Sequence, residues 1–204
     1  MSKANIATWE ERFAIEGFLF GTAPNEFLAR EAGRLAPGSR VLCVADGEGR
    51  NSTYLAGLGH DVHAVEAAAN ALDKARALAA ERGVEVAFEQ VDLEEWDWPV
   101  AAYDAVVAIF IQFTDPAGRA RMFAQMAAAL KPGGVLLLEG YGPGQLAYGT
   151  GGPKHLDHLY TVDELRTAFP GFDVLLLEEY DAVLDEGPRH QGMSALVDLV
   201  AVRR

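Results

Sequence analysis

VLCVADGEGRNSTYLAGLGHDVHAVE, residues 41–66, is the stretch of sequence that decides the fold. It opens with the apolar residues 41–45, a continuous run typical of a strand buried on both faces. A turn with two glycines, Gly47 and Gly49, follows. Glycine allows a positive φ and lets a ligand approach the main chain closely, because it has no Cβ. A helix and a second strand are expected in the remainder, so the stretch predicts a nucleotide pocket in outline.

The second strand ends on Glu66, about 20 residues after the first glycine, where an acidic side chain in such units binds ribose hydroxyls. A dinucleotide site needs a third glycine at the position of Ser52. Asp46 and Glu48 also bring two carboxylates to the helix N-terminus, where a pyrophosphate would bind. A cationic ligand without phosphates, such as S-adenosylmethionine, suits this turn better. A nucleotide-dependent oxidoreductase and a tight turn that binds nothing stay open as alternatives.

The composition limits the classes of function. The 204 residues, half of them apolar, suffice for one domain with a full core. A net charge of -13 disfavours broad contact with nucleic acid, so a small-molecule partner is expected. The one cysteine, Cys43, leaves no disulfide, which favours the cytoplasm. No apolar stretch approaches the ~20 residues of a membrane helix, and the N-terminus lacks a signal-peptide pattern. A monomer and a dimer are equally compatible with the sequence.

Strand and helix patterns alternate along the rest of the chain. The expected strands are 41–45, 61–66, 84–88, 103–110, 135–141, 172–180 and 195–202, and the expected helices are 50–58, 72–83, 116–130 and 161–169. A glycine-rich loop is expected over 142–153. No helix separates the last two strands, so they should pair antiparallel. The predicted fold is a Rossmann-like α/β three-layer sandwich, a seven-stranded mostly parallel sheet with an antiparallel last strand and helices on both faces.

One domain is expected, residues 1–204, with a helical lid or cap segment over residues 1–35 and a core over 36–204. Trp9, Phe13 and Phe20 lie in the N-terminal segment. They either cover the acceptor or simply dock the apolar side of a helix. The loop 185–192, with His190, either borders the same pocket mouth or is a mobile hairpin tip.

Five short segments carry a family resemblance. They read WEERF at 9–13, GTAPNEFL at 21–28, GEGRN at 47–51, LKPGG at 130–134 and GTGGP at 149–153. With the strand pattern, they resemble the class I S-adenosylmethionine-dependent methyltransferases, and more narrowly the branch of tellurite-resistance (TehB-type) and thiopurine methyltransferases. The resemblance covers nearly the whole chain. It implies S-adenosylmethionine as cofactor and S-adenosylhomocysteine as its product.

The same resemblance implies a set of cofactor-binding residues. They are Asp46, Gly47, Glu48, Gly49, Asn51, Glu66, Ala67, Asp92, Leu93 and Ile109. The turn would meet the methionine part of the cofactor and Glu66 the ribose, while Asp92 and Leu93 would hold the adenine. Cys43 stands where most class I enzymes have an acidic residue, which leaves Asp46 or a water for the cofactor's ammonium group.

The implied reaction moves a methyl group to a small-molecule acceptor, such as a thiol, a metalloid or another soft nucleophile. A sulfonium methyl is already electrophilic, so the protein mainly has to align the reactants and exclude water. No side chain is singled out as a general base. The acceptor-side candidates are Gln112, Tyr141, Trp9, Phe13 and Phe20. A module that binds the cofactor without turnover is the main alternative.

A metal site has little support in the sequence. His155, Asp157 and His158 lie close together, but no further set of ligands with zinc-like spacing accompanies them. We therefore expect no metal.

Overall fold

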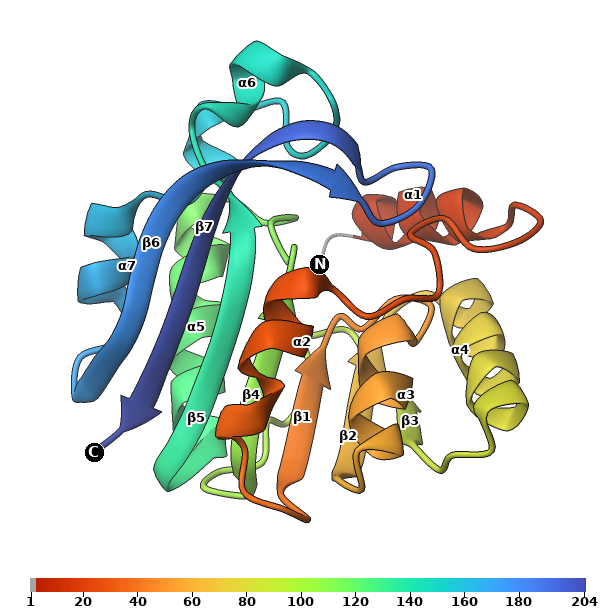
Figure 1. Cartoon of the computed structure of the whole chain (residues 1–204), viewed down its shortest axis with the longest axis horizontal. Helices are drawn as coiled ribbons and strands as arrows, with labels where there is room; N and C mark the ends of the chain where they lie inside the picture. The colour runs from red at the N-terminus through yellow and green to blue at the C-terminus, as the bar shows by residue number, and fades with distance from the viewer. Residues whose placement is uncertain (1–2) are drawn as a thin grey trace.

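Strands β1 to β7 form one mixed sheet in the computed structural model, which describes residues 3–204 (Figure 1). Their bounds are β1 (Arg40–Val44), β2 (Asp61–Glu66), β3 (Ala87–Gln90), β4 (Tyr103–Ile109), β5 (Leu130–Tyr141), β6 (Phe172–Asp185) and β7 (Gln191–Arg203). Residues 1–2 of the expected lid segment lie outside the described residues. The strand order is β3-β2-β1-β4-β5-β7-β6, with β1 to β5 parallel and β7 antiparallel to both β5 and β6. The predicted Rossmann-like fold is confirmed.

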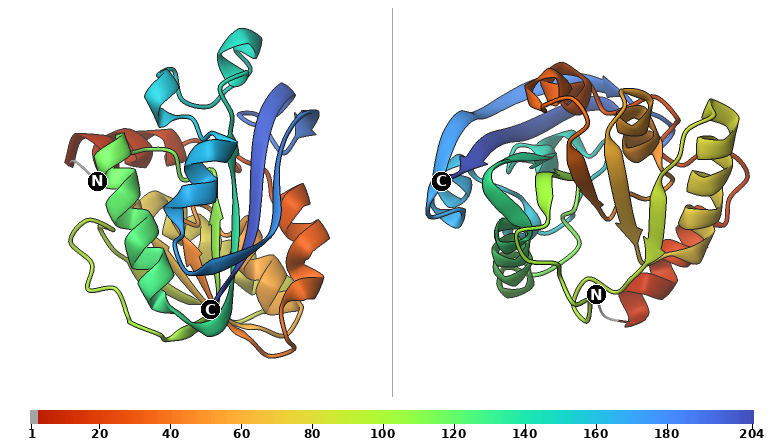
Figure 2. Two further views of the ribbon diagram at one scale, coloured as in Figure 1. Left: turned by 90° about the vertical axis from the view of Figure 1, so that its left-hand side faces the viewer. Right: turned by 90° about the horizontal axis from the view of Figure 1, so that it is seen from below.

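Helices cover both faces of the sheet (Figure 2). They are α1 (Lys3–Phe13), α2 (Glu26–Glu31), α3 (Arg50–Gly57), α4 (Ala69–Arg82), α5 (Pro116–Ala129), α6 (Gln145–Tyr148) and α7 (Val162–Ala168), with short 3-10 helices at Ala32–Arg34 and Leu156–His158. None of the helices within residues 3–204 is long and apolar enough to cross a membrane.

The two faces of β1 explain why its sequence is continuously apolar. Val41 and Cys43 belong to the core cluster that contains the α2 and α3 side chains. Leu42 and Val44 belong to the opposite cluster, which contains the α5 and α7 side chains. Successive side chains of a strand point to opposite faces, so a central strand covered by helices on both sides must be apolar throughout.

Several predicted boundaries differ from those of the structure; β6 and β7, for example, extend to Phe172–Asp185 and Gln191–Arg203. β3 begins at Ala87 because pairing starts at His63↔Ala87, and an edge strand has only one neighbour to define its ends. β1 ends at Val44, since Ala45 takes a left-handed conformation with φ 49°. The helix expected to Leu130 stops one residue earlier and β5 begins there, because the residue before Pro132 is restricted to an extended conformation. The expected loop 142–153 contains the short helix α6.

The β6–β7 hairpin extends beyond the sheet and bends over the C-terminal ends of the parallel strands toward α1 (Figure 1). Its turn meets the chain that follows α1. A Cβ on Gly187 would lie 2.4 Å from the Gly21 nitrogen and 3.0 Å from the Phe20 Cα. The hairpin tip and the N-terminal segment are therefore in direct backbone contact above one end of the sheet.

The turn between β1 and α3 is also closely packed, and Gly49 makes that packing possible. Gly49 has φ +85°, and a Cβ there would lie 2.7 Å from the Ala75 Cβ in α4. Gly47, with φ +62°, has more room, since a Cβ there would lie 3.6 Å from the Phe13 ring. Gly49 thus serves the fold itself, by letting α4 approach the turn.

We expect Gly49→Ala to destabilise the protein by about 2 to 4 kcal/mol, through the strained φ together with the steric clash with α4. Gly59→Ala is the matched control, because Gly59 has a similar φ of +90° but open space at its Cβ position. Gly59→Ala should lose about 1 to 2 kcal/mol of stability, because only the left-handed backbone conformation is unfavourable for alanine there. Urea unfolding of both variants measures the difference, and equal losses would exclude a packing role for Gly49.

Candidate functional site

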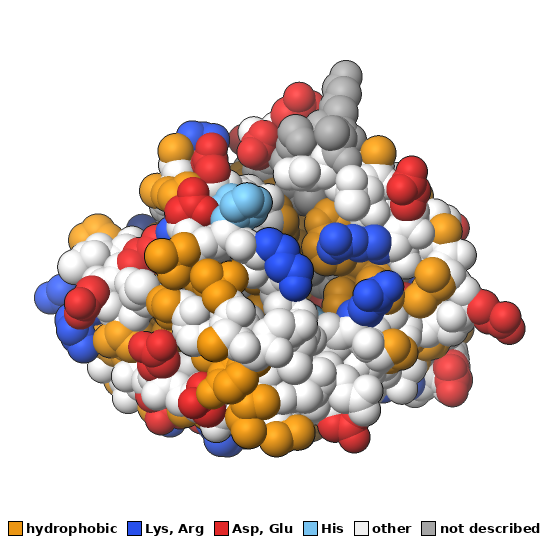
Figure 3. Space-filling model, turned by 90° about the horizontal axis from the view of Figure 1, so that it is seen from above, with side chains coloured by type: hydrophobic (Ala, Val, Ile, Leu, Met, Phe, Trp, Pro, Cys, Tyr) orange, Lys and Arg blue, Asp and Glu red, His pale blue; other side chains and the backbone are white. Residues whose placement is uncertain are grey.

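Most of the predicted cofactor-binding residues meet at one edge of the sheet. β1 to β4 are parallel, so their C-terminal ends lie together. The turn after β1, Glu66 at the end of β2, Asp92 after β3 and Ile109 at the end of β4 all lie at this edge. In open α/β sheets, ligands bind in the crevice at this edge. Figure 3 views the molecule from this end, where lysine and arginine side chains lie beside exposed hydrophobic groups.

Glu66 joins the β1–α3 turn to the start of α4. Its Oε2 accepts a hydrogen bond from the Gly47 nitrogen at 3.0 Å. Its Oε1 accepts from the nitrogens of Ala67 at 2.8 Å and Ala68 at 2.9 Å. A carboxylate offers about four acceptor positions, so three are used by the main chain and one is left on Oε2. Glu66 can therefore accept from one ribose hydroxyl without losing any of these bonds.

Asp46 supplies a second carboxylate beside Glu66. It accepts a hydrogen bond from the Ser52 hydroxyl and another from the Ser52 nitrogen at 3.3 Å. Burial raises the pKa of Asp46 to about 7 against the lowering effect of these bonds, and the charge of Glu66 raises it further. Burial likewise raises the pKa of Glu66. Cys43, in contrast, is buried in the core on the α2 and α3 face.

The hydrogen bonds of Ser52 also bear on whether a dinucleotide could bind at this turn. A pyrophosphate would bind the main-chain nitrogens at the N-terminus of α3. There the Asp46 carboxylate already accepts from the nitrogen and the hydroxyl of Ser52. A second anion at this position would be repelled, so the local chemistry favours a cation.

Glu48 and Asn51 bind the N-terminal segment in this structure. Buried Glu48 accepts from the nitrogens of Leu19 at 2.7 Å and Phe20 at 3.2 Å, and it forms an ion pair of 2.9 Å with Lys74. Asn51 Oδ1 accepts from the Asn25 nitrogen at 3.0 Å. Their direct contact with a cofactor stays a prediction, while their role in fixing the segment over the turn is visible.

The remaining predicted cofactor contacts, among them the adenine contacts Asp92 and Leu93, lie at or just after the ends of β2, β3 and β4. Ala67 is buried and follows Glu66 directly. Asp92 accepts a hydrogen bond from the Glu94 nitrogen at 3.1 Å, and the Leu93 carbonyl accepts one from the Trp98 indole at 3.0 Å. Ile109 is partly exposed at the last position of β4. The binding role of these residues stays a prediction.

Aromatic side chains from four parts of the chain pack together beside the β1–α3 turn. We call this the aromatic cluster; it consists of Trp9, Phe13, Phe20, Phe110, Tyr141 and His190. Ring centroids are 5.5 Å apart for Trp9 and Phe13, and 6.1 Å for Phe13 and Phe20. Phe110, with a strained φ of 56° after β4, lies 4.7 Å from Tyr141. Four of the five acceptor-side candidates are thus brought together.

Gln112, the fifth candidate, has its amide group fully engaged. Its Oε1 accepts from the Tyr141 nitrogen at 2.6 Å, while its Nε2 donates to the carbonyls of Tyr141 at 2.9 Å and His158 at 3.0 Å. Both amide hydrogens are therefore used by the main chain. In this structure Gln112 holds the end of β5 in place, and its contact with an acceptor stays a prediction.

Glu186, in the hairpin turn, was missed by the sequence analysis. This buried carboxylate accepts from Arg50 Nη2 at 2.8 Å, Asn25 Nδ2 at 3.1 Å and the Glu26 nitrogen at 2.9 Å. Burial alone would raise the pKa of Glu186, but its hydrogen-bond donors and the charge of Arg50 outweigh this and lower the pKa to about 2. Glu186 lies 160 residues from Glu26, so no local pattern could reveal the contact.

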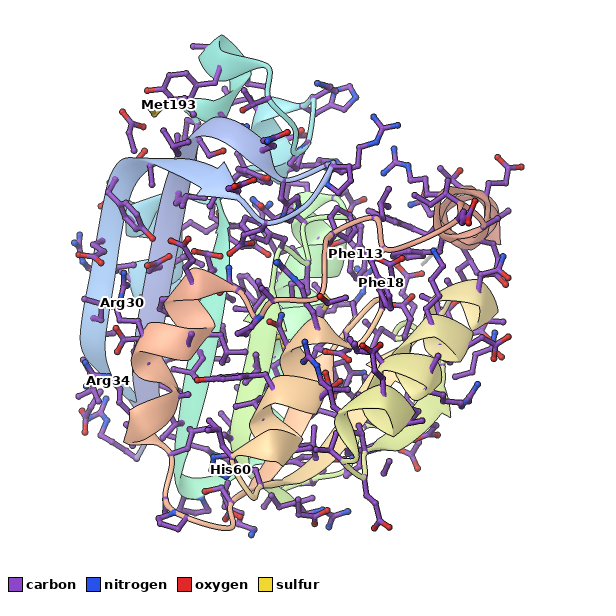
Figure 4. All side chains as sticks on the ribbon, turned by 45° about the vertical axis from the view of Figure 1, so that its right-hand side comes forward. Phe18, Arg30, Arg34, His60, Phe113 and Met193 are labelled. Carbon is purple, nitrogen blue, oxygen red and sulfur yellow. The ribbon has the colours of Figure 1, made fainter. Side chains whose placement is uncertain are left out.

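A pair of buried carboxylates on β5 and β7 lies next to Glu186. Glu139 and Asp198 are paired in register, and both are buried. Asn25 Nδ2 donates to Glu139. Arg30 of α2, labelled in Figure 4, forms an ion pair of 2.8 Å with Asp198. Burial of the two carboxylates beside each other raises the pKa of both.

The comparisons with known proteins agree with this geometry. Residues 41–134 match the family model described as "Methyltransferase domain". A structure reported for the conversion of a disulfide bond into a thioacetal group during echinomycin biosynthesis has a TM-score of 0.76 and 19% identity over 98% of this chain and 90% of that one. A methyltransferase from Methanosarcina mazei has a TM-score of 0.71 and 17% identity, covering 89% and 98%. TehB from Haemophilus influenzae has a TM-score of 0.73 and 15% identity, covering 98% and 67%. No curated protein matches the chain in sequence.

The sheet order is that of the class I methyltransferase fold, and the methyltransferase match covers residues 41–134 of this chain. The cofactor is S-adenosylmethionine, and its product is S-adenosylhomocysteine. The residues present fit it. Asp46 and Glu66 repel each other and suit a cation, Glu66 keeps one acceptor position, and Gly47 presents main chain without a Cβ.

Glu186→Gln should lower stability by about 3 to 5 kcal/mol at neutral pH, because Arg50 would then be a buried charge without its partner. Since the pKa of Glu186 is about 2, its contribution is present above the ordinary glutamate pKa and is lost as the pH falls toward 2. The difference in stability between Glu186→Gln and the native protein should therefore shrink as the pH falls toward 2. Denaturant unfolding at several pH values measures it.

The control for this prediction is Asp73→Asn, which removes the exposed ion pair with Arg76. It should cost less than about 1 kcal/mol, because exposed ion pairs contribute little. A loss of that small size in Glu186→Gln would contradict the assigned role of the buried pair.

Proposed function

We propose that this protein transfers a methyl group from S-adenosylmethionine to a small-molecule acceptor that is a soft nucleophile, most simply a thiol. The observation that carries the proposal is the placement of the aromatic cluster directly beside the Asp46–Gly49 turn and Glu66. Phe13 lies against Gly47 and connects both parts. When bound, the cofactor supplies an electrophilic methyl group.

The residues of the chain then have separate tasks. Glu66 accepts a hydrogen bond from the ribose through its remaining acceptor position, and Asp46 faces the ammonium group. Asp92 and Leu93 bind the adenine, Ile109 lies beneath the cofactor, and Ala67 contacts it. The aromatic cluster excludes water around the methyl group, and its rings favour a nearby positive charge. A soft acceptor needs this alignment and desolvation more than it needs strong proton transfer.

The similar structure from echinomycin biosynthesis concerns the conversion of a disulfide bond into a thioacetal group, which is sulfur chemistry. This supports a sulfur acceptor as the first class to test, with metalloids of the TehB-type branch as the next. The net charge of -13 supports a small molecule, and not a nucleic acid, as the partner. With its one cysteine buried in β1, we place the protein in the cytoplasm.

We further propose that residues 1–35 act as a lid on the core formed by residues 36–204. Within the described residues, Glu48 holds the nitrogens of Leu19 and Phe20, and Lys74 donates to the Gly17 carbonyl at 2.6 Å. These polar contacts surround the small apolar cluster of Phe13, Leu19, Ala68 and Ala71. The part of this segment before Asn25 is held by a few such contacts, so it can open for cofactor exchange and close to exclude water, whereas α2 is packed into the core.

Glu66→Gln should weaken the binding of S-adenosylhomocysteine by about 10- to 150-fold, or about 1.5 to 3 kcal/mol, because the ribose loses a charged acceptor. Isothermal titration calorimetry measures the dissociation constant. Glu10→Gln is the matched control, since Glu10 also accepts from a main-chain nitrogen of α4, that of Asn70, at 3.0 Å. Its affinity should stay within about twofold of the native value.

Two results would contradict this account. Unchanged affinity in Glu66→Gln would exclude the ribose role, and binding of NAD in preference to S-adenosylhomocysteine would favour the oxidoreductase. Tight binding of S-adenosylhomocysteine without a methylated product, over a panel of thiols and metalloids analysed by mass spectrometry, would favour a non-catalytic binding module.

The affinity for S-adenosylhomocysteine should rise with pH. Asp46, with a pKa of about 7 in the free protein, must ionise to attract the ligand's ammonium group. Binding should therefore be about tenfold tighter at pH 8 than at pH 6, and should release a proton near pH 7. Calorimetry in buffers of different ionisation enthalpy detects that proton. Asp46→Asn should remove the pH dependence, and its persistence in that variant would assign it to another group.

A further inference from the structure

His190 occupies the centre of the acceptor side, although the sequence analysis gave it no chemical role. It follows the β6–β7 turn and is only 7% exposed. Its ring lies 4.5 Å from the ring of Phe20 and 4.4 Å from that of Phe110, with Tyr141 at 5.9 Å. These neighbours belong to the lid segment, the end of β4 and the end of β5. The imidazole is therefore placed above the carboxyl ends of β4 and β5.

The backbone of the turn fixes the position of this ring. The His190 nitrogen donates to the Gly187 carbonyl at 3.1 Å, and the His190 carbonyl accepts from the Glu186 nitrogen at 2.9 Å. Gly187 packs against Phe20 and Gly21 so closely that a Cβ has no room. A ring held by a tight turn and by packing on several sides is preorganised, as a group that meets a substrate needs to be.

The polar surroundings favour one orientation of the imidazole. Nδ1 is buried, has no hydrogen-bond partner and lies 3.7 Å from Glu186 Oε2, which is longer than a hydrogen bond. Glu186 is already engaged by Arg50 and Asn25. A proton on Nδ1 would face this carboxylate, which leaves the lone pair on Nε2.

The charged and titratable groups that face His190 are Glu186 of its own hairpin, Arg50 of α3 and Tyr141 of β5. Burial lowers the pKa of His190, the carboxylate of Glu186 raises it, and the charge of Arg50 lowers it. The net direction is downward, so the imidazole is neutral at pH 7. Burial raises the pKa of Tyr141, which keeps that phenol protonated. Within the aromatic cluster, His190 is thus the side chain able to accept a proton.

We propose that His190 is the proton acceptor for the methyl acceptor, which is a molecule with an S–H group that is protonated at neutral pH. This inference rests on the proposed methyl transfer and names the substrate class of that same site. Nε2 takes the proton of the acceptor's S–H group, and the electron pair left on that sulfur forms the new bond to the methyl carbon. The bond between the methyl carbon and the cofactor sulfur breaks, and its electron pair stays on the cofactor sulfur. The imidazolium then releases its proton to water.

The test compares two acceptors that differ in the need for a base. 2-Mercaptoethanol is an alkyl thiol, which is mostly protonated at pH 7, whereas 5-thio-2-nitrobenzoate is already a thiolate. His190→Gln should slow transfer to 2-mercaptoethanol by about 100-fold or more at pH 7 and change transfer to the thiolate by less than about threefold. For the native enzyme, kcat/KM with 2-mercaptoethanol should rise with pH through a value below about 6.5.

His155→Gln is the matched control, because His155 is an exposed histidine on the loop after β5 and lies outside the aromatic cluster. It should leave both rates unchanged. Binding of S-adenosylhomocysteine by His190→Gln should stay within about twofold, and its thermal unfolding should show a folded protein. Proton NMR of the His190 ring in the native protein, assigned with the variant, should show a neutral imidazole at pH 7.

The outcomes separate the two proposals. Equal slowing of both acceptors, or an imidazolium at pH 7 in the NMR titration, would overturn the role of His190 and leave the methyl transfer standing. Failure of the native enzyme to methylate any acceptor, despite tight cofactor binding, would overturn the methyl transfer and the role of His190 with it.

Discussion

The buried carboxylate of Glu186 is the contact on which the arrangement of the site depends. It joins the first residue of α3, the start of α2 and the β6–β7 turn, three segments that the sheet alone does not bring into contact. Arg50 stands at a helix N-terminus, where a positive charge is unfavourable without a partner. The ion pair of 2.8 Å with Glu186 provides that partner and at the same time holds the hairpin close to the β1–α3 turn.

The buried carboxylates at this end of the molecule fall into two groups, whose pKa values are shifted in opposite directions. Glu186 is surrounded by donors and is held ionised, with its pKa near 2. Glu139 and Asp198 share a buried position where the pKa of each is raised, so they favour a proton between them. Asn25 donates to both groups and so connects them. Neighbouring carboxylates can coexist in the core because only some of them need to carry charge.

The N-terminal segment and the hairpin close the site from two sides. The segment is held by Glu48 and by packing of its aromatic side chains, whereas the hairpin is held by Glu186 and by the backbone contact at Gly187. His190 packs between Phe20 of the segment and Phe110, which follows β4. The aromatic cluster therefore forms only when both parts are in place, which joins two segments that are far apart in sequence.

The sequence by itself determined the sheet and the glycine turn, because these follow from local periodicity, and the family resemblance added Asp92 and Ile109 to the site. It also indicated a cation in place of a pyrophosphate, through Ser52 and the neighbouring carboxylates. Only the tertiary structure showed that Gly49 packs on Ala75, that the Gln112 amide is consumed by main chain, and that Glu186 and His190 reach the site. Those contacts join residues far apart along the chain, and the direction of a bending hairpin is set by packing that leaves no local pattern in the sequence.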